Sequence, residues 1–427
     1  MKTTKYDLNA LIPTIPAGVA ALTGFEPGHA HQHLVPQGFG KIDVSKDTLR
    51  DYRYALEDLG DKGYPLLFGP TGSGKTAFVK RVCEFTNRPL VTISCNSEME
   101  AHSFFGQYVL NEKGGMEYRL AALANAFKNG FICFLDEIDN LNPDAAFALK
   151  GILSGGSITI PETGEVIARH PEFKLVAAAN TNLAGDETGL YTGQSQSKAL
   201  ARHFFFIPFG YMPMEQELGV LKKEFPNFGN KFLTAQKAAG AAWVQDLSDK
   251  RFPGVEKAIT DGDFALAADI VGQVVLEKIL KVANVTRDLF KGNPLSESEG
   301  KELETVIDTG SVIAWVHAVE SFAMAPNPLQ YALERVVTLG ATRDHKREIH
   351  QIAENEFGDL WQGAAASTGS QAQSGNASMS WETGEDAPQP QKPAFSGWLD
   401  EELKRGRYQD RESVTLVDMF NDFRKEV

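Results

Sequence analysis

A short stretch in the first part of the chain has the residue types and the spacing that bind the phosphates of a nucleotide. Its order is Gly69, Pro70, Thr71, Gly72, Ser73, Gly74, Lys75 and Thr76, which fits the pattern G-x-x-x-x-G-K-T. The glycines let the backbone wrap an anion closely, so that successive N–H groups and the start of the next helix point at the phosphates. We expect Lys75 to reach the outer phosphates of ATP and the Thr76 hydroxyl to ligate Mg²⁺.

Two acids further along the chain form a second candidate element. Residues 131–135 are an apolar run, and Asp136 and Glu137 follow it. A buried parallel strand of this kind ends at the carboxyl edge of a sheet, where ligands bind. We expect Asp136 to hold Mg²⁺ and Glu137 to act as general base on the attacking water. Acids in this place can also cap a following helix, but their position downstream of a phosphate loop favours the catalytic interpretation.

A polar amide ends a third apolar run. Residues 173–179 predict a buried strand, and Asn180 follows directly. An asparagine at a strand end is often a turn former. Here the order of phosphate loop, acidic strand and asparagine strand favours a role in orienting the attacking water.

The stretches around these residues predict strands that alternate with helices. Residues 65–68 before the loop and 89–94 after it are apolar runs, and residues 76–85 have a helical pattern. Residues 45–59 carry leucines and a tyrosine at spacings of three and four, which predicts a helix leading into the loop strand. This alternation predicts an α/β fold, with a parallel sheet of about five strands between helices.

Two hairpins are expected within this pattern. One covers residues 106–119, around a Lys-Gly-Gly turn, and separates helical runs at 97–105 and 120–129. It is either a surface excursion or a loop directed at a partner or a central pore, with Tyr108 or Tyr118 as the gripping residue. The second covers residues 156–167.

Taken together, these motifs resemble the AAA+ ATPases, and among them the MoxR-type clade, which has a hairpin inserted in its second helix. A narrower resemblance, to the CobS subunit of cobaltochelatase, is carried by residues 170–175, 178–181 and 185–193. The resemblance covers roughly residues 60 to 210 and becomes thin beyond them.

The resemblance implies a helical lid domain after the α/β core and a homo-oligomeric, hexameric ring with ATP between neighbouring subunits. It also implies an arginine given in trans to the next subunit's ATP, and Arg202 is the matching position. Ala201 stands where relatives commonly have an acid, and Arg202 can alternatively be an exposed cation at a helix end. Gly310 stands where relatives have a second sensor arginine, for which Arg287 and Arg335 are candidates.

We divide the chain into five parts: an N-terminal arm at 1–44, an α/β ATPase core at 45–212, a helical lid domain at 213–361, a disordered linker at 362–394, and an amphipathic tail at 395–427. The arm contains His29, His31 and His33, for which solvated side chains on a loosely ordered segment are favoured over a metal site. The tail is either a docking element or a helix that packs on the lid.

Composition narrows the function classes. The formal net charge of −14 disfavours a surface that coats nucleic acid. The N-terminus lacks a signal-peptide layout, and no long apolar run predicts a membrane span, so we expect a cytoplasmic protein. Cys83, Cys95 and Cys133 are expected to be buried, reduced thiols.

The sequence therefore predicts an Mg²⁺-dependent ATPase that remodels a partner protein. By the resemblance, one alternative is the ATPase subunit of a cobaltochelatase, which inserts cobalt into a corrinoid. Its partner would then carry a von Willebrand-type domain on a separate chain. Further alternatives are a nucleic-acid motor, which the acidity disfavours, and a non-hydrolysing nucleotide switch, which Glu137 and Asn180 disfavour.

Overall fold

The computed structural model describes residues 1–12, 15–18, 20–39, 44–112, 114–183, 185, 190, 196, 198–295 and 303–362. These residues all belong to one compact unit, Met1–Thr368. The predicted tail, and the predicted linker apart from Gln362, lie outside the described residues.

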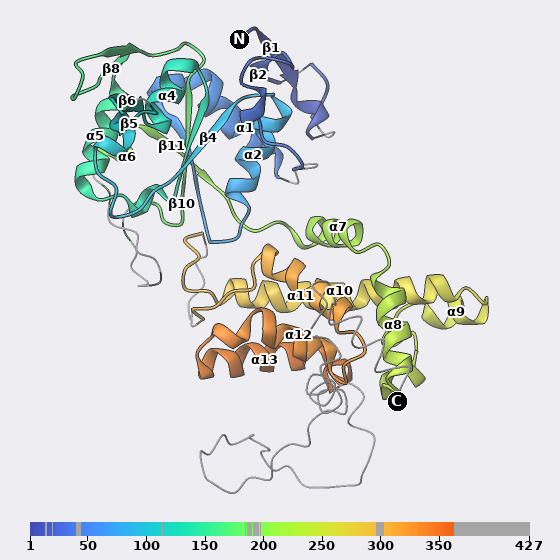
Figure 1. Cartoon of the computed structure of the whole chain (residues 1–427). Helices are drawn as coiled ribbons and strands as arrows, with labels where there is room; N and C mark the ends of the chain where they lie inside the picture. The colour runs from blue at the N-terminus through green and yellow to red at the C-terminus, as the bar shows by residue number, and fades with distance from the viewer. Residues whose placement is uncertain are drawn as a thin grey trace, which may run out of the picture. The chain divides into compact units, whose positions relative to one another are not determined.

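A five-stranded parallel sheet lies at the centre of the first half of the chain (Figure 1). Its strands, in spatial order, are β11 (Phe204–Pro208), β3 (Tyr64–Phe68), β10 (Lys174–Ala179), β7 (Ile132–Asp136) and β4 (Leu90–Ser94). Ala179 pairs with Phe68, and Ser94 pairs with Asp136, so the carboxyl ends of these strands meet at one edge. The predicted α/β fold is confirmed.

Helices cover both faces of this sheet because its central strands are apolar on both sides. Phe78 and Val82 of α2 (Lys75–Phe85) and Tyr52 of α1 (Lys46–Arg53) pack with Phe134 of β7 in one cluster. A short π-helical segment, Tyr54–Leu59, continues α1, so the two together cover the helix predicted at 45–59. A second hydrophobic cluster contains side chains of α4 (Ala122–Asn129) and α5 (Pro143–Ser154).

Both predicted hairpins are present. One is formed by β5 (Gly106–Leu110) and β6 (Met116–Leu120), and the other by β8 (Ser157–Thr159) and β9 (Val166–Ala168). Tyr118 Oη donates a hydrogen bond of 3.0 Å to Glu162 Oε2, which links the two hairpins. Leu110 and Met116, at the end of the first hairpin, are 71% and 62% exposed.

The helix predicted at residues 97–105 is mostly wrong, because only α3 (His102–Phe105) is helical. The Asn96 side chain accepts a hydrogen bond from the Glu98 backbone N–H. This local bond stabilises a turn in place of a helical start.

The expectation of a loosely ordered N-terminal arm is also wrong. Strands β1 (Thr3–Asp7) and β2 (Ala21–Phe25) form an antiparallel pair. Leu8, Leu11 and Leu22 are buried in the same cluster as α1 and α2. The segment therefore extends the core, and its pairing depends on contacts distant in sequence, which a local pattern does not reveal.

Two of the three histidines of this segment, His29 and His31, contact the core, whereas His33 is exposed. The His29 ring lies 3.1 Å from Asn87 O, and the His31 ring packs edge-on against Phe131. Within the described part of the chain, no cluster of residues could hold a metal ion.

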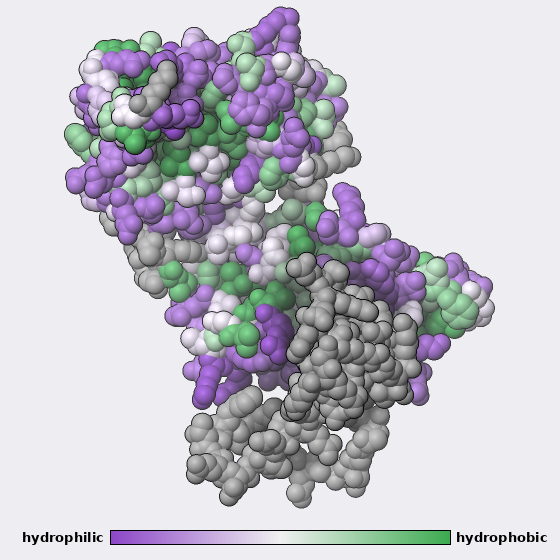
Figure 2. Space-filling view, in the orientation of Figure 1, coloured by the Kyte–Doolittle hydropathy of each residue, from purple (hydrophilic) through white to green (hydrophobic). Residues whose placement is uncertain are grey.

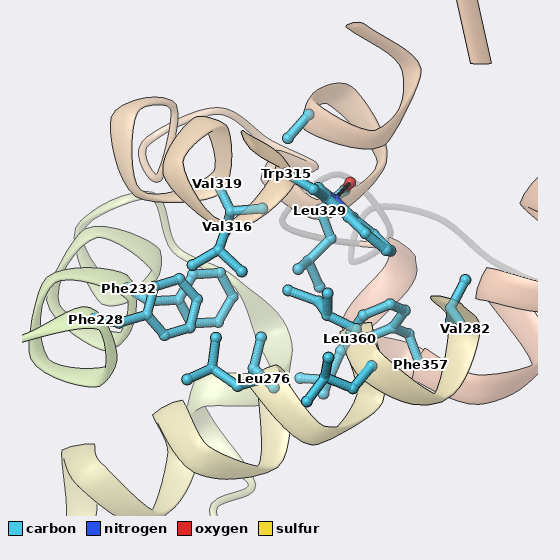
Figure 3. Packing of buried hydrophobic residues seen from close by; sticks show 14 of the residues in the cluster. Phe228, Phe232, Leu276, Val282, Trp315, Val316, Val319, Leu329, Phe357 and Leu360 are labelled. Carbon is cyan, nitrogen blue, oxygen red and sulfur yellow. Dashed lines mark hydrogen bonds between the residues drawn. The ribbon is translucent and has the colours of Figure 1, made fainter. Parts of the chain in front are cut away.

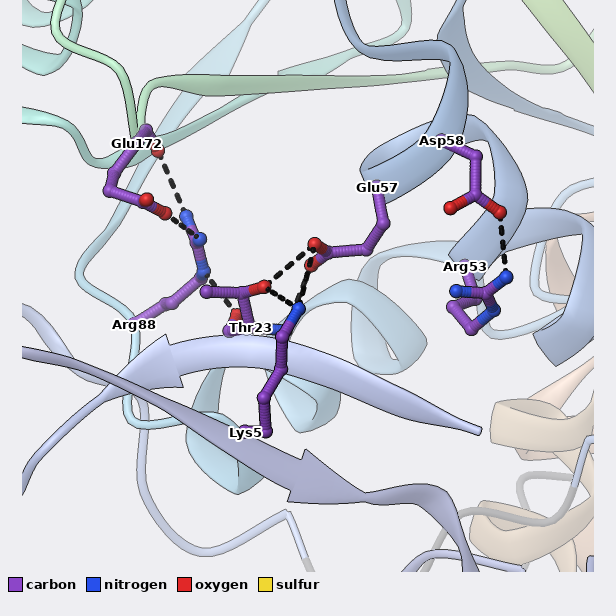
Figure 4. Close-up of polar contacts among 7 residues, drawn as sticks. All are labelled: Lys5, Thr23, Arg53, Glu57, Asp58, Arg88 and Glu172. Atoms are coloured by element: carbon purple, nitrogen blue, oxygen red, sulfur yellow. Dashed lines mark hydrogen bonds and ion pairs between the residues drawn. The ribbon is translucent and has the colours of Figure 1, made fainter. Parts of the chain in front are cut away.

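Arg88 fixes the N-terminal strands to the core (Figure 4). Its Nε donates to Thr23 O, and its other nitrogens donate to the backbone and side-chain oxygens of Glu172. The guanidinium also lies over the Phe25 ring, and the side chain is only 1% exposed. A buried charge of this kind is tolerated because it is paired and hydrogen-bonded.

The second half of the described chain is helical. Its helices are α7 (Met214–Glu224), α8 (Phe228–Ala238), α9 (Val255–Thr260), α10 (Phe264–Asp288), α11 (Thr309–Ser321), α12 (Pro328–Val336), α13 (Arg343–Phe357) and α14 (Asp359–Gln362). Figure 3 shows Phe228 and Phe232 of α8, Leu276 of α10 and Trp315 of α11 converging in one hydrophobic core. Figure 2 shows hydrophilic residues over much of the visible face, with hydrophobic residues in smaller areas.

The remaining composition-based expectations concern thiols and membranes. All three cysteines are free and buried, and burial raises the pKa of the Cys83 and Cys133 thiols to about 12. Among the helices that can be described, none combines the length and the apolar character needed to cross a bilayer.

We predict that Arg88→Met lowers the free energy of unfolding by about 3 kcal/mol, because Glu172 and the Thr23 carbonyl lose their buried partner. The matched control is Arg53→Met, which breaks the more exposed pair of Arg53 with Asp58 and should change stability by at most about 0.5 kcal/mol. Urea denaturation of both variants measures the difference. Equal effects would show that Arg88 does not hold the N-terminal strands.

Candidate functional site

The phosphate-loop motif connects β3 to α2 at the carboxyl edge of the sheet. Gly72 and Gly74 have φ angles of 67° and 95°, in the left-handed region that favours glycine. Gly74 is the N-cap of α2. Ser73 Oγ is buried and has no hydrogen-bond partner among the described residues. A loop with an unpaired hydroxyl beside a helix N-terminus fits an anionic ligand.

Lys75 lies inside this loop. Its Nζ donates to Gly69 O at 2.8 Å, to Pro70 O at 2.9 Å, and to Asn180 Oδ1 at 3.1 Å. Burial lowers the pKa of Lys75 to about 8, against the opposite effect of Asp136 and other nearby acids. The structure thus brings together the lysine of the loop and the asparagine at the end of β10, as the sequence order predicts for one site.

Thr76 and Asp136 also meet. Thr76 Oγ1 donates a hydrogen bond of 2.8 Å to Asp136 Oδ2. The side-chain oxygens of Thr76 and Asp136 are thus neighbours at the carboxyl edge of the sheet. They can serve as ligands for Mg²⁺, which prefers oxygen ligands.

Glu137 follows Asp136 with an unusual backbone. Its φ of 57° places a non-glycine residue in the left-handed region, where strain is common at functional sites. The side chain is exposed, and its Oε2 accepts a hydrogen bond of 3.1 Å from Asn140 Nδ2. An exposed carboxylate at the strand end is accessible to a water molecule and to a ligand.

Asp139 is a site residue that the sequence reasoning missed. It is 1% exposed, and its Oδ2 accepts hydrogen bonds from the backbone N–H groups of Asn180 and Thr181 and from Thr181 Oγ1. Burial raises the pKa of this carboxyl, although these hydrogen bonds oppose the rise. The spacing Asp-Glu-x-Asp, which places a third acid one short turn after the strand, was the available signal.

Arg202 lies apart from these side chains along the chain, between α6 (Lys198–Ala201) and β11. Its side chain is exposed and forms no hydrogen bond or ion pair within the described ranges, while its backbone N–H donates to Lys198 O at 3.3 Å. An exposed arginine whose side chain has no partner among the described residues is available to a second copy of the chain.

A cavity of about 600 Å³ lies beside the phosphate loop. Residues of the loop and α2, of the segment after β11, and of α11 line it, including Ser73, Phe78, Phe209 and Ile313. Tyr211 Oη donates to Thr71 O at 2.9 Å at this side of the loop. Apolar walls next to a phosphate-binding loop suit the flat base of a nucleotide.

Both candidates for a second sensor arginine contact other described side chains. Arg287 is buried and forms two hydrogen bonds, of 2.7 and 2.8 Å, with the buried carboxylate of Glu217. Its guanidinium also lies 4.5 Å from the centre of the Tyr211 ring. Arg335 lies over the Tyr331 ring.

Comparisons with known proteins agree with this geometry. The model of the AAA domain (dynein-related subfamily) matches residues 65–204. The chain is 25% identical to the aerobic cobaltochelatase subunit CobS of Sinorhizobium over 289 residues, which are 66% of this chain and 73% of that protein. It is 38% identical to the protein NorQ of Paracoccus denitrificans over 152 residues, which are 35% of this chain and 56% of NorQ.

A third relative is an uncharacterized protein of Staphylococcus aureus, 30% identical over 192 residues, with 44% of this chain and 70% of that protein covered. The range matched by the AAA domain model contains the phosphate loop, the acidic strand and the asparagine strand. This chain therefore belongs to the AAA+ ATPases of the MoxR type.

Proposed function

We propose that this protein is a ring-forming, Mg²⁺-dependent ATPase that couples ATP hydrolysis to the remodelling of a partner protein. The observation that carries the proposal is the meeting of Lys75, Thr76, Asp136 and Asn180 at one edge of the sheet, within hydrogen-bonding distance of one another in pairs. Such a group combines a cation, two oxygen ligands and an amide around the place where a terminal phosphate would lie.

In this proposal each side chain has one task. The phosphate loop binds the phosphates through its backbone, and Lys75 stabilises the charge that develops on them during attack by water. Glu137 takes the proton of that water, and Asn180 orients it. Thr76 and Asp136 hold Mg²⁺, which neutralises charge on the phosphate oxygens when it is bound.

Arg202 completes the site from the neighbouring subunit. The exposure of its side chain, and the absence of a side-chain partner within the described residues, support this role. An arginine supplied in trans stabilises the transferred phosphoryl group, so hydrolysis requires assembly. We propose a hexameric ring, as the family resemblance implies.

The partner of the ring is proposed to be a protein that carries a von Willebrand-type domain on a separate chain. The exposed Leu110 and Met116 at the end of the β5–β6 hairpin are available for such a contact. Free, buried cysteines support a cytoplasmic location, because disulfides are rare there.

A second candidate function is the ATPase subunit of a cobaltochelatase. The match to a protein named as such a subunit over 66% of this chain favours it. A nucleic-acid motor is disfavoured by the net charge of −14, and stimulation of ATP hydrolysis by DNA would support it.

We predict that Lys75→Ala abolishes ATP binding, whereas Glu137→Gln retains binding and loses turnover. Lys75 contacts the phosphates in both the ground and the transition state, while Glu137 acts on the attacking water alone. Calorimetric titration with ATP and a phosphate-release assay separate the two effects. Equal loss of ATP binding in both variants would contradict the assignment.

The role of Arg202 in trans predicts rescue between two inactive variants. Arg202→Ala has an intact pocket, and Lys75→Ala has an intact arginine. Each alone should be slower than the wild type by on the order of 10³-fold or more. Mixed rings contain interfaces where both parts are intact, so the single-turnover rate of the mixture should exceed the sum of the separate rates. Absence of rescue despite proven subunit exchange would point to another arginine, with Arg169 the nearest candidate.

A further inference from the structure

A buried glutamine, Gln196, connects the turn after Glu137 with the segment that leads to Arg202. In the proposed function, Glu137 acts on the subunit's own ATP and Arg202 acts on the neighbour's ATP. The Gln196 side chain is 8% exposed, and its Nε2 donates to Leu141 O at 2.8 Å and to Asp139 O at 3.3 Å. Its backbone N–H donates to Leu183 O at 2.9 Å. Gln196 is therefore fixed at its main chain and at its side chain, against the short turn that follows Glu137.

That turn also carries the link to Asn180. The Asp139 carboxylate holds the backbone of Asn180 and Thr181, as described above, while the Asp139 carbonyl accepts from Gln196. Asp139 thus contacts both the strand end that bears Asn180 and the segment that leads toward Arg202. In the proposed function, Asn180 acts on the subunit's own ATP and Arg202 acts on the ATP of the neighbouring subunit.

Arg202 is anchored from both directions along the chain. After it, His203 O accepts from Tyr64 N at 2.8 Å, and β11 then pairs with β3. Before it, Leu200 of α6 is fully buried, and Gln196 is tied to the turn at residues 137–141. The Arg202 side chain makes no hydrogen bond within the described residues, and its backbone N–H donates to Lys198 O at 3.3 Å, so its position depends on α6 and on these two anchors.

We propose that Gln196 is a positioning residue for Arg202. It links the position of this arginine, which acts on the neighbouring subunit's ATP, to the turn at residues 137–141 of its own subunit. This inference rests on the proposed function. In physical terms, movement of the turn at residues 137–141 with the nucleotide state shifts two carbonyl acceptors, and the Gln196 amide follows them. The state of one pocket is thereby conveyed to the arginine of the next pocket.

The variant that tests this is Gln196→Met, which keeps the length of the side chain and removes its donors. ATP binding should change by no more than about twofold, because Gln196 does not contact the loop. Single-turnover hydrolysis should fall on the order of 10- to 100-fold, since a small misplacement of a catalytic group has an effect of this size. The double variant with Arg202→Ala should be no slower than Arg202→Ala alone, because both changes act through the same group.

The chain offers a matched control in the helical part. Gln236 is 1% exposed, and its Nε2 donates to Ala323 O at 2.7 Å and to Ala325 O at 3.3 Å, the same kind of double bond to two carbonyls. Gln236→Met should lower the thermal midpoint about as much as Gln196→Met, with hydrolysis per folded protein within about twofold of the wild type. An equal loss of hydrolysis in both variants would mean that Gln196 has a structural role only, and would overturn the proposal.

Mixed rings decide which pocket Gln196 serves. Subunits with Gln196→Met retain an intact pocket, and subunits with Lys75→Ala supply a correctly held Arg202. Mixing them should restore single-turnover hydrolysis in the pockets of the Gln196→Met subunits. No restoration in proven mixed rings would show that Gln196 acts on its own pocket, through Asn180, and would overturn the proposal.

Two further measurements keep the result interpretable. If Gln196→Met subunits do not enter rings, Gln196→Asn keeps the amide but shortens its reach. It should give a smaller loss, and no loss at all would overturn the inference. If Arg202→Ala slows hydrolysis and Gln196→Met does not, the inference alone fails. If Arg202→Ala has no effect on hydrolysis, both the proposed role of Arg202 and the inference about Gln196 fail.

Discussion

A buried ammonium group is the constraint around which the candidate site is arranged. Lys75 is only 8% exposed, and its three N–H bonds are matched by three acceptors, two carbonyls of its own loop and the Asn180 side chain. An unpaired charge at this depth would be strongly unfavourable. The glycines that turn the loop back on itself and the strand order that brings Asn180 beside β3 are both needed to satisfy it.

The same arrangement explains how the loop can accept a nucleotide. Phosphate oxygens are charged and are therefore stronger acceptors than the carbonyls of Gly69 and Pro70. In the proposed function, a bound nucleotide would give Lys75 charged acceptors in place of these neutral ones, with Asn180 still within reach. The parallel register of β3, β10 and β7 keeps Asp136 at the same edge.

The helical part carries a second buried charge of a different kind. Glu217 and Arg287 are 0% and 3% exposed and pair through two hydrogen bonds, and Arg287 Nε donates to Ile307 O, next to Asp308. Asp308 caps α11, and its carboxylate lies so near the phosphate loop that a Cβ at Gly72 would collide with it. Arg287 is thus occupied in fixing the elements beside the loop.

The sheet and the candidate site residues were within reach of sequence reasoning because both depend on local pattern. Apolar runs that end in Asp136 and Asn180 predict strands whose ends meet, and turn residues predict the hairpins. The N-terminal strands were missed because Arg88 and Thr23, 65 residues apart, hold them in place. Gln196 was missed for the same reason, because its role comes from hydrogen bonds to carbonyls distant in sequence, and no residue pattern records which backbone atoms become neighbours. Asp139 was missed although the spacing Asp-Glu-x-Asp marked it, because the sequence does not show that its carboxylate bonds to the backbone of Asn180 and Thr181.

In the proposed ring, each ATP is held by one subunit and completed by Arg202 of the next. The most direct measurement is a structure of the assembled Glu137→Gln ring with ATP and Mg²⁺. We expect the Arg202 guanidinium within hydrogen-bonding distance of the terminal phosphate bound by the neighbouring subunit, and Lys75 of that neighbouring subunit on the same phosphate. An Arg202 that faces solvent at a closed, ATP-filled interface, with a different residue on the phosphate, would contradict it.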